Sequence, residues 1–303
     1  MGGKCTLCPR TCEADRNAAA GFCGAPKDME IATVCTHRGE EPPLNPIVNI
    51  FFAHCNLQCI YCQNWQISHG KNLSAGSERL TADSLAERIV SELPPAATNA
   101  TPLIGFVTAA HYADRLPAIA EAIRRQGLKP VFVYNSSGYE SVDTLRSLEG
   151  LIDIYLPDLK YMDPLLATAY SFAPDYPTVA AKAMLEMKRQ VGSGLKTDDN
   201  GTAYRGIIVR HLVLPGAVGN SLCCLDWLAD NFDPFVLHLS LMAQYFPPHP
   251  GLPSPLDRTL TAEEYAAVTE HAEALGFTHG WVQDLNARDN YRPDFSRKDS
   301  PFE

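Results

Sequence analysis

From residue 46 onward, hydrophobic and polar positions follow two alternating patterns. Short runs rich in β-branched and aromatic residues, typical of buried strands, alternate with stretches whose apolar residues recur every three or four positions, as in amphipathic helices. The predicted strands are Ile47–Ala53, Leu103–Thr108, Pro130–Ser136, Asp153–Leu159, Gly206–Leu214 and Val236–Met242. The predicted helices are Ala82–Leu93, Arg115–Arg125, Ser141–Leu148, Tyr176–Val191, Ser221–Asn231 and Ala262–Leu275.

The order strand–helix, repeated six times, predicts an α/β fold with a parallel sheet and right-handed crossovers. A closed barrel of this type needs eight units, and six, with a cysteine-rich loop after the first strand, fit a partial (β/α)6 TIM-like barrel. Thr81 is placed to cap the first helix, with Asp83 in its first turn. Asp198–Gly201 has the composition of a hairpin turn inserted before the fifth strand.

The first 45 residues have a different character. They are rich in cysteine, resemble a loop, and end in Glu40-Glu41-Pro42-Pro43. We therefore predict three parts: a cysteine-rich metal-binding segment at 1–45, the partial barrel at 46–285, and a polar C-terminal tail at 286–303.

Composition narrows the class of protein. The chain has 303 residues, 46% of them hydrophobic, which is enough for one large domain. The net charge is −10 and no Lys/Arg block is present, which argues against a nucleic-acid partner. Apolar runs such as Ile207–Leu214 are far shorter than the roughly 18–20 residues of a membrane span. The start of the sequence shows no apolar export signal, so we expect a cytoplasmic protein.

Ten cysteines are present, and eight of them precede residue 63. In a long chain with short cysteine spacings, metal ligation in a reducing compartment is a better interpretation than disulfide bonding. Cys35 stands apart and is interpreted as a free thiol, and the adjacent Cys223 and Cys224 as core packing.

Cys55, Cys59 and Cys62 form a CxxxCxxC motif directly after the first predicted strand. Three thiolates this close predict one metal centre, and they are one ligand short of a closed iron–sulfur or zinc site. An open position is what a catalytic metal keeps for a substrate or cofactor. The alternatives are an incidental trio of buried cysteines and a zinc site completed by His54 or His69.

Polar residues recur where the predicted strands end, and this is the side on which such folds carry their chemistry. Any single polar residue in a loop is weak evidence, but the recurrence in register indicates a ligand site. The candidates are Thr108, His111, Asn135, Ser136, Asp158, Lys160, Arg210 and Gln244.

A second set of four cysteines lies near the start of the chain, at Cys5, Cys8, Cys12 and Cys23. Four thiolates are the complement of a closed zinc site or of a second [4Fe-4S] cluster. The sequence does not choose between these metals, and free thiols are the alternative.

With these motifs, the chain resembles the radical S-adenosylmethionine (SAM) proteins related to the pyruvate formate-lyase activating enzyme, in particular an uncharacterised activating-enzyme-like branch. The resemblance runs over nearly the whole chain. It rests on Cys5–Cys12, Gly21–Ala25, His37, Gly39–Pro42, Phe51–Phe52, Cys55–Asn64, Val133–Tyr139, Asp153–Tyr161, Ala173–Pro177 and Val209–Gly216.

The resemblance implies an oxidoreductase in which Cys55, Cys59 and Cys62 hold a [4Fe-4S] cluster whose open iron binds SAM. One electron then cleaves SAM, and the resulting 5′-deoxyadenosyl radical abstracts hydrogen from a substrate. Tyr61 is expected to contact adenine. The other expected SAM contacts are Asp158 and Lys160, Arg210 at the carboxylate, and Asn135 and Ser136 at the ribose or carboxylate. The alternatives are a packed loop tyrosine for Tyr61, a surface ion pair for Asp158 and Lys160, a strand-end salt bridge for Arg210, and turn caps for Asn135 and Ser136. Gln244 is a further candidate because it is a polar residue at the end of the sixth strand.

One departure from the family pattern concerns the residues after the second strand. Many activating enzymes carry Gly-Gly-Glu there, at the SAM amino group, whereas this chain has Thr108-Ala109-Ala110-His111. Thr108 or His111 is the candidate replacement, and a structural role for His111 is the alternative.

The resemblance also implies partners: a reductant such as flavodoxin or ferredoxin, and a glycyl radical enzyme as the substrate. The alternative is radical SAM modification of another protein, a peptide or a small molecule. A more distant alternative is a non-catalytic iron–sulfur or zinc protein, against which the polar strand ends argue.

Overall fold

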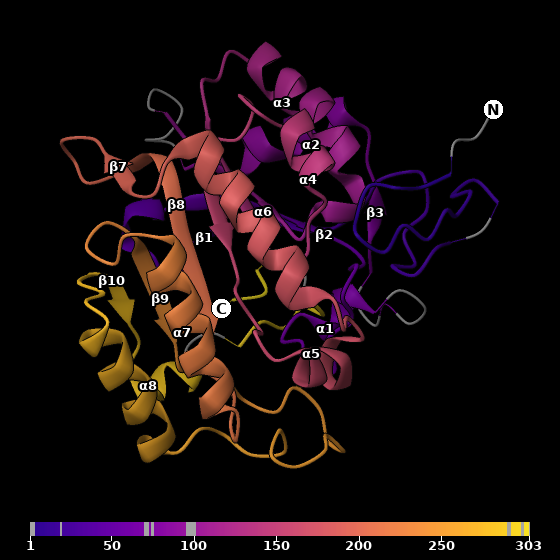
Figure 1. Cartoon of the computed structure of the whole chain (residues 1–303). Coiled ribbons are helices and arrows are strands. Elements are labelled where there is room, and N and C mark those ends of the chain that lie inside the picture. Colours follow the sequence, from indigo (N-terminus) through magenta and orange to yellow (C-terminus); the bar gives the residue numbers. More distant parts are fainter. Residues whose placement is uncertain are drawn as a thin grey trace.

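The computed structural model describes residues 4–18, 20–69, 73, 76–94, 101–289, 292–297 and 300–302. At its centre is a sheet with the strand order β10-β9-β8-β6-β5-β4-β2-β1-β3, with β7 attached to β8 (Figure 1). The strands are β1 Glu30–His37, β2 Ile47–Phe52, β3 Glu78–Arg79, β4 Leu103–Val107, β5 Val131–Ser136, β6 Ile154–Pro157, β7 Leu195–Thr197, β8 Ala203–Leu212, β9 His238–Met242 and β10 His279–Val282.

Helices connect the strands and cover the outer face of the sheet (Figure 1). The helices are α1 Trp65–Ser68, α2 Ala82–Glu92, α3 Leu116–Arg125, α4 Val142–Ser147, α5 Pro164–Ser171, α6 Tyr176–Val191, α7 Val218–Asn231 and α8 Ala262–Ala274, with 3-10 turns at η1 Pro42–Leu44, η3 Ala110–Arg115 and η4 Leu285–Asp289. The predicted cap of α2 is confirmed, because the Ser84 amide donates to Thr81 Oγ1 at 3.2 Å. The short helices α1 and α5 were not predicted from the sequence.

The six predicted strands are confirmed as β2, β4, β5, β6, β8 and β9, and they pair in parallel. A seventh parallel strand, β10, was missed because its four residues are mostly exposed and give no apolar run. Within the described residues, the end strands β10 and β3 each pair with one neighbour, so the sheet is open, as the partial-barrel prediction requires.

The prediction of a loop throughout residues 1–45 is wrong for Glu30–His37, which forms β1, antiparallel to β2. A register irregularity between Ile31 and Thr33 interrupts the alternation of side chains, which hides the strand in the sequence. The hairpin prediction is confirmed: β7 pairs antiparallel with β8, and the Asp198 amide donates to Thr202 O at 2.9 Å. The domain boundary at residue 45 stays a prediction.

Alternation along each strand divides the core into two parts. The outward side chains, such as Phe106 and Phe132, pack beneath the helices in the main hydrophobic cluster. Inward side chains near the strand starts, such as Leu103 and Val131, form a smaller cluster inside the sheet. Further along the strands the inward positions become polar, which creates a site at their carboxyl ends.

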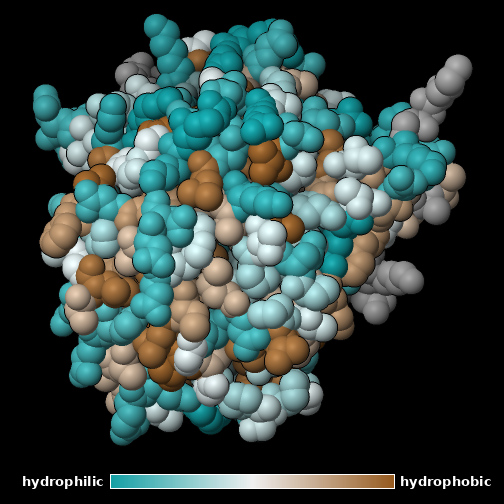
Figure 2. All heavy atoms as spheres, viewed as in Figure 1, coloured by the Kyte–Doolittle hydropathy of each residue, from teal (hydrophilic) through white to brown (hydrophobic). Residues whose placement is uncertain are grey.

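Figure 2 shows a mostly hydrophilic face with small, separate apolar patches. None of the described helices is long and apolar enough to cross a membrane.

Candidate cofactor site at the carboxyl ends of the strands

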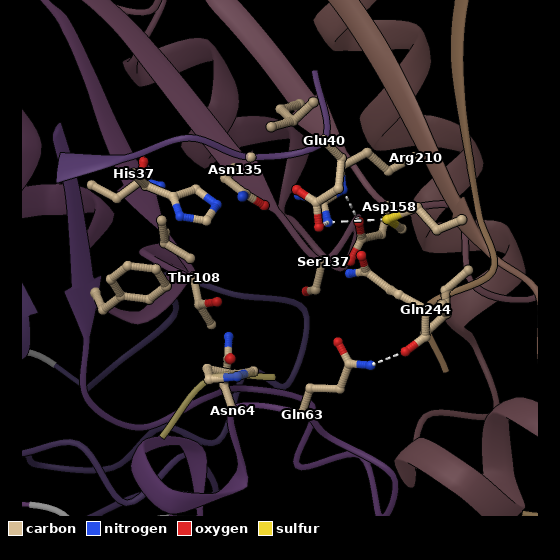
Figure 3. Close-up of a pocket in the computed structure, with 18 of the residues that line it drawn as sticks. His37, Glu40, Gln63, Asn64, Thr108, Asn135, Ser137, Asp158, Arg210 and Gln244 are labelled. Atoms are coloured by element: carbon tan, nitrogen blue, oxygen red, sulfur yellow. Dashed lines mark hydrogen bonds and ion pairs between the residues drawn. The ribbon is translucent and has the colours of Figure 1, made fainter. Parts of the chain in front are cut away.

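A cavity of about 200 Å³ opens where the parallel strands end. Figure 3 shows side chains from several strands pointing into this one space. All three cysteines of the CxxxCxxC motif line it, together with most of the predicted cofactor contacts: Tyr61, Thr108, Asn135, Asp158, Lys160, Arg210 and Gln244. The expectation that the polar strand ends form one site is therefore supported by the tertiary structure.

The cysteine loop follows β2 and curls back on itself. Two residues with positive φ, His54 (74°) and Gln58 (58°), turn the backbone. The Cys62 amide then donates to Cys59 O at 3.1 Å, and α1 begins directly afterwards. This local fold brings all three sulfur atoms to the cavity.

Each of the three sulfur atoms accepts a hydrogen bond from a different donor. The Leu57 amide donates to Cys55 Sγ at 3.4 Å, Ser171 Oγ to Cys59 Sγ at 2.9 Å, and Ser68 Oγ to Cys62 Sγ at 3.4 Å. Burial raises the pKa of Cys55 and Cys59 to about 11, so both are thiols at neutral pH until a metal displaces the protons. Donors at all three sulfurs fit an iron–sulfur cluster held as thiolates.

A single metal ion fits this loop less well than a cluster. In the part of the chain that the structure describes, no three His, Cys, Asp or Glu side chains are gathered as ligands of one ion. A cluster does not need this arrangement, because each cysteine binds a different iron. His54 Nε2 is already bonded to Glu30 Oε2 at 2.7 Å, and His69 does not line the cavity, so neither supports the zinc alternative.

A charged wall faces the cysteines across the cavity. Lys160 Nζ donates to Asp158 Oδ2 at 2.6 Å, and Arg210 Nε lies 3.6 Å from Asp158 Oδ1. Among the described residues, Asp158 Oδ1 and Arg210 Nε are buried and have no hydrogen-bond partner. Because buried polar atoms are normally paired, this acceptor and this donor fit a bound group that supplies both charges, such as the ammonium and carboxylate of an amino acid.

Two glutamates in this wall were not predicted as site residues. Glu40 Oε1 and Glu41 Oε1 each lie 3.7 Å from a nitrogen of Arg210, and Figure 3 shows Glu40 beside Arg210. Glu41 is 4% exposed, accepts a hydrogen bond from Ser240 Oγ at 2.8 Å, and has its pKa raised by burial to about 7. The acidic pair was visible in the sequence, but nothing local indicated that its loop enters the barrel.

Two predicted contacts, His111 and Ser136, do not line the cavity. Ser136 is adjacent to the inward-facing Asn135, so alternation turns it outward, where its hydroxyl donates to Glu140 Oε1 at 2.7 Å. His111 Nε2 lies 2.7 Å from Ala53 O, and burial lowers its pKa to about 3, which fits the structural alternative. Thr108 does line the cavity and remains the candidate at the position of the missing Gly-Gly-Glu.

Tyr61 and Gln244 both line the cavity, but they differ in the contacts that they already make within the protein. Tyr61 is 4% exposed, and its ring packs edge-on against the ring of Tyr245, with the ring centres 6.3 Å apart. The Gln244 side chain already accepts from Gln283 Nε2 at 2.9 Å, and its backbone carbonyl accepts from Gln63 Nε2 at 2.9 Å. Contact of Tyr61 with adenine stays a prediction, and Gln244 is partly committed to positioning the loop.

Among the amino-terminal cysteines, Cys23 interacts electrostatically with the other three. Burial raises the pKa of Cys23, and the neighbouring Cys12 and Cys5 raise it further. Burial raises the pKa of Cys8 to about 12, with Cys23 contributing. Among the described residues, no three of these thiols are gathered as ligands of one ion, and their metal stays a prediction.

Arg10, between Cys8 and Cys12, joins this segment to the cluster loop. Its guanidinium donates to the carbonyls of Asn56 (2.9 Å), Ser171 (3.1 Å) and Phe172. The group also lies 3.9 Å from the centre of the Phe22 ring. Together with Gln58, whose Nε2 donates to Phe22 O at 2.6 Å, this side chain docks the amino-terminal segment on the cysteine loop.

The described part of the C-terminal tail also reaches the site. Gln66, in α1, bonds the tail at Asp294 Oδ1 (3.2 Å) and at the Phe295 amide (2.8 Å). The Phe302 ring lies 4.2 Å from the His37 ring, and both line the cavity. The tail thus forms part of the cavity wall.

No family model matches the chain. The uncharacterized protein MJ0674 of Methanocaldococcus jannaschii is 28% identical over 277 residues, covering 89% of this chain and 74% of that protein.

Solved structures with a related arrangement include anSMEcpe with bound AdoMet, with a TM-score of 0.48, 13% identity and 73% of this chain covered. Methylornithine synthase (TM-score 0.44, 14% identity, 72% covered) and HydG, a maturase of the [FeFe]-hydrogenase (0.44, 12%, 82%), are similar at the same level. This chain spans 56%, 59% and 58% of those three chains, respectively. Matches at this level establish no activity for the chain.

Proposed function

We propose that this chain is a radical SAM enzyme, with a [4Fe-4S] cluster on Cys55, Cys59 and Cys62 and SAM in the adjoining cavity. The observation that carries the proposal is the shared cavity. It holds three cysteines, one ligand short of a closed cluster, together with a buried acceptor and a buried donor that pair as ions but have no hydrogen-bond partner. The motif spacing and the resemblance of the sequence support the same function.

The residues of the charged wall have distinct proposed roles. Asp158 Oδ1 accepts a hydrogen bond from the ammonium of SAM, and Arg210 donates to its carboxylate. Glu40 and Glu41 flank Arg210 and hold its charge at the cavity, while Lys160 fixes the second oxygen of Asp158. When bound, the cluster and SAM supply a one-electron cleavage whose product removes hydrogen from a substrate.

Other lining residues orient the cofactor. Tyr61 offers its ring to the adenine, and Asn135 and Thr108 offer polar atoms to the ribose and the amino group. Tyr61 is buried, whereas Thr108 and Asn135 are half-buried.

Anaerobic reconstitution with iron and sulfide tests the proposal. The wild-type protein is compared with Cys59→Ala and with Cys224→Ala, the latter a buried cysteine on α7 outside the cavity. We expect about four irons to be lost in Cys59→Ala and retained in Cys224→Ala. With dithionite and SAM, only protein that keeps the cluster should form 5′-deoxyadenosine. Wild-type protein that takes up no iron would overturn the proposal.

The same preparation addresses the amino-terminal cysteines. We propose that they bind zinc or a second [4Fe-4S] cluster. Metal that remains in the Cys55/Cys59/Cys62→Ala variant would identify the occupant, and a variant without metal would leave these cysteines as free thiols.

For the substrate, we propose a glycyl radical enzyme first, because the sequence resembles the activating-enzyme-like branch, and a flavodoxin or ferredoxin as reductant. A glycyl radical signal on a purified partner after incubation with the reduced enzyme and SAM would support this choice. SAM cleavage stimulated by another protein, a peptide or a small molecule, without such a signal, would assign the alternative.

A further inference from the structure

We propose that the hydroxyls of Ser171, Tyr161 and Tyr61 form a relay that runs from the SAM cavity to Cys59 and raises the reduction potential of the cluster. The inference rests on the proposed function and goes beyond it, because it assigns a task to residues that need not touch the cofactor. Ser171 and Tyr161 were not identified from the sequence.

The relay is continuous and buried. Ser171 Oγ donates to Cys59 Sγ at 2.9 Å and lies 2.7 Å from the Tyr161 hydroxyl. The Tyr161 hydroxyl in turn is 2.7 Å from that of Tyr61, to which it donates in the structure. Ser171 and Tyr161 are fully buried, whereas Tyr61 lines the cavity. Hydrogen bonds in such a setting are strengthened by the low local dielectric and polarise one another.

Counting protons fixes the direction of the relay once iron is bound. A cysteine that binds iron is a thiolate, which accepts hydrogen bonds and has no proton to give. Ser171 then gives its single proton to the sulfur, so Tyr161 must give its proton to Ser171, and Tyr61 must give its proton to Tyr161. All three contacts are satisfied in this arrangement, in which the Tyr61–Tyr161 bond is reversed.

The reversal leaves the lone pairs of the Tyr61 oxygen without a donor from Tyr161, and Tyr61 is one of the residues that line the cavity. A donor on the bound cofactor that reaches this oxygen strengthens each bond in turn, down to the sulfur. Binding in the cavity is thereby communicated to Cys59 without movement of the backbone.

The backbone holds Ser171 in place. Ser171 is the last residue of α5, and the following Phe172 is in the left-handed region with φ of 53°. Arg10 Nη2 donates to Ser171 O at 3.1 Å, and the Ile60 amide donates to Tyr170 O at 2.9 Å. The hydroxyl therefore belongs to a segment that is tied to the cysteine loop on two sides.

The relay acts on the one-electron reduction of the cluster from the 2+ to the 1+ state, with the electron supplied by the reductant. Reduction adds negative charge to the cluster and its thiolates. A donor aimed at a thiolate stabilises the more negative state, so it raises the reduction potential. The one side-chain hydroxyl that contacts Cys62 among the described residues is that of Ser68, at the longer distance of 3.4 Å, which makes this pair a matched control.

The experiment is anaerobic spectroelectrochemistry, with and without SAM, on reconstituted wild-type protein and on Ser171→Ala, Tyr161→Phe and Ser68→Ala. We expect Ser171→Ala to lower the midpoint potential more than Ser68→Ala does. Tyr161→Phe keeps the donor on Cys59, so we expect a smaller lowering without SAM and a smaller SAM-induced change than in the wild type. Iron content verifies that each variant holds the cluster.

The outcomes separate the relay from the proposed function. A wild-type protein without a reducible cluster overturns the proposed function itself. A reducible wild type whose potential is unchanged in Ser171→Ala, or lowered equally in Ser68→Ala, overturns the relay alone. If Ser171→Ala loses the cluster, Tyr161→Phe decides, because an unchanged potential and an unchanged effect of SAM would refute the relay.

Discussion

Replacing Arg10 with alanine tests whether the amino-terminal segment stabilises the cysteine loop. The arginine side chain bonds three backbone carbonyls, those of Asn56, Ser171 and Phe172, and stacks on Phe22. Alanine removes all of these contacts and leaves the covalent chain and the cysteines unchanged. We therefore expect local loosening of the loop rather than unfolding of the barrel.

The magnitude follows from the contacts. A hydrogen bond from a charged donor contributes about 1.5–3 kcal/mol, and the freed arginine regains roughly 2 kcal/mol of side-chain entropy. The site is only partly buried, so solvent replaces some of the lost bonds, and a net loss of about 2–4 kcal/mol of local stability is expected. At 1.4 kcal/mol per tenfold change, the loop should open about 30- to 700-fold more often.

Hydrogen–deuterium exchange of the reconstituted protein measures this opening directly. Peptides covering residues 55–62 and 164–172 should exchange faster in Arg10→Ala. The bonded amides of Ile60 and Cys62 lie in the first peptide, and those of Ala167 and Phe172 lie in the second. Arg10→Lys keeps the charge but loses the planar guanidinium, so its exchange rate should lie between those of Arg10→Ala and the wild type. Arg125→Ala, which removes an arginine paired with Asp83 and Glu121 on the surface, is the control.

Equal exchange of these peptides in Arg10→Ala and Arg125→Ala would refute the reasoning, because the three carbonyl contacts would then contribute nothing measurable. Faster exchange spread evenly over all strands would also refute it, since the effect would be global destabilisation rather than loss of docking.

Three further changes have defined outcomes. Asp158→Ala should weaken SAM binding by roughly 1–3 kcal/mol, and an unchanged Kd by calorimetry would make Asp158 only a partner of Lys160. Burial raises the pKa of Glu140 from 4.5 to about 7, so its folded form holds a proton that the unfolded form has lost in this window. The stabilisation from this group is fully present below pH 4.5, and the free energy of unfolding falls by about 3 kcal/mol as the pH rises from there through 7. Urea unfolding of Glu140→Gln should lack this fall. Parallel pH profiles of the unfolding free energy in the variant and the wild type would contradict the prediction. Cys23→Ser should remove the amino-terminal metal while sparing the cluster iron, and unchanged total metal would assign Cys23 as a free thiol.

The sequence by itself determined the elements and the reacting groups. Strand and helix periodicity is a local property, so the six parallel strands and the hairpin before β8 were predictable from runs of a few residues. Cys55, Cys59 and Cys62 were found for the same reason, since their spacing within one loop carries the signal.

The tertiary structure decided which polar groups share the site. Asn135 and Ser136 are neighbours at a strand end, and only the facing of the strand in the sheet separates a cavity residue from one bonded to Glu140. Strand β1 was hidden because its alternation is irregular, and β10 because it is exposed.

Glu41 and Ser171 show why local patterns do not suffice. Glu41 bonds Ser240, 199 residues away, and Ser171 bonds Cys59, 112 residues away. Such contacts depend on how the loops cross the open barrel, which is set by the packing of the whole sheet and its helices. The type and spacing of side chains can be read from a short stretch of sequence, but the distances between remote side chains are set only when the chain folds.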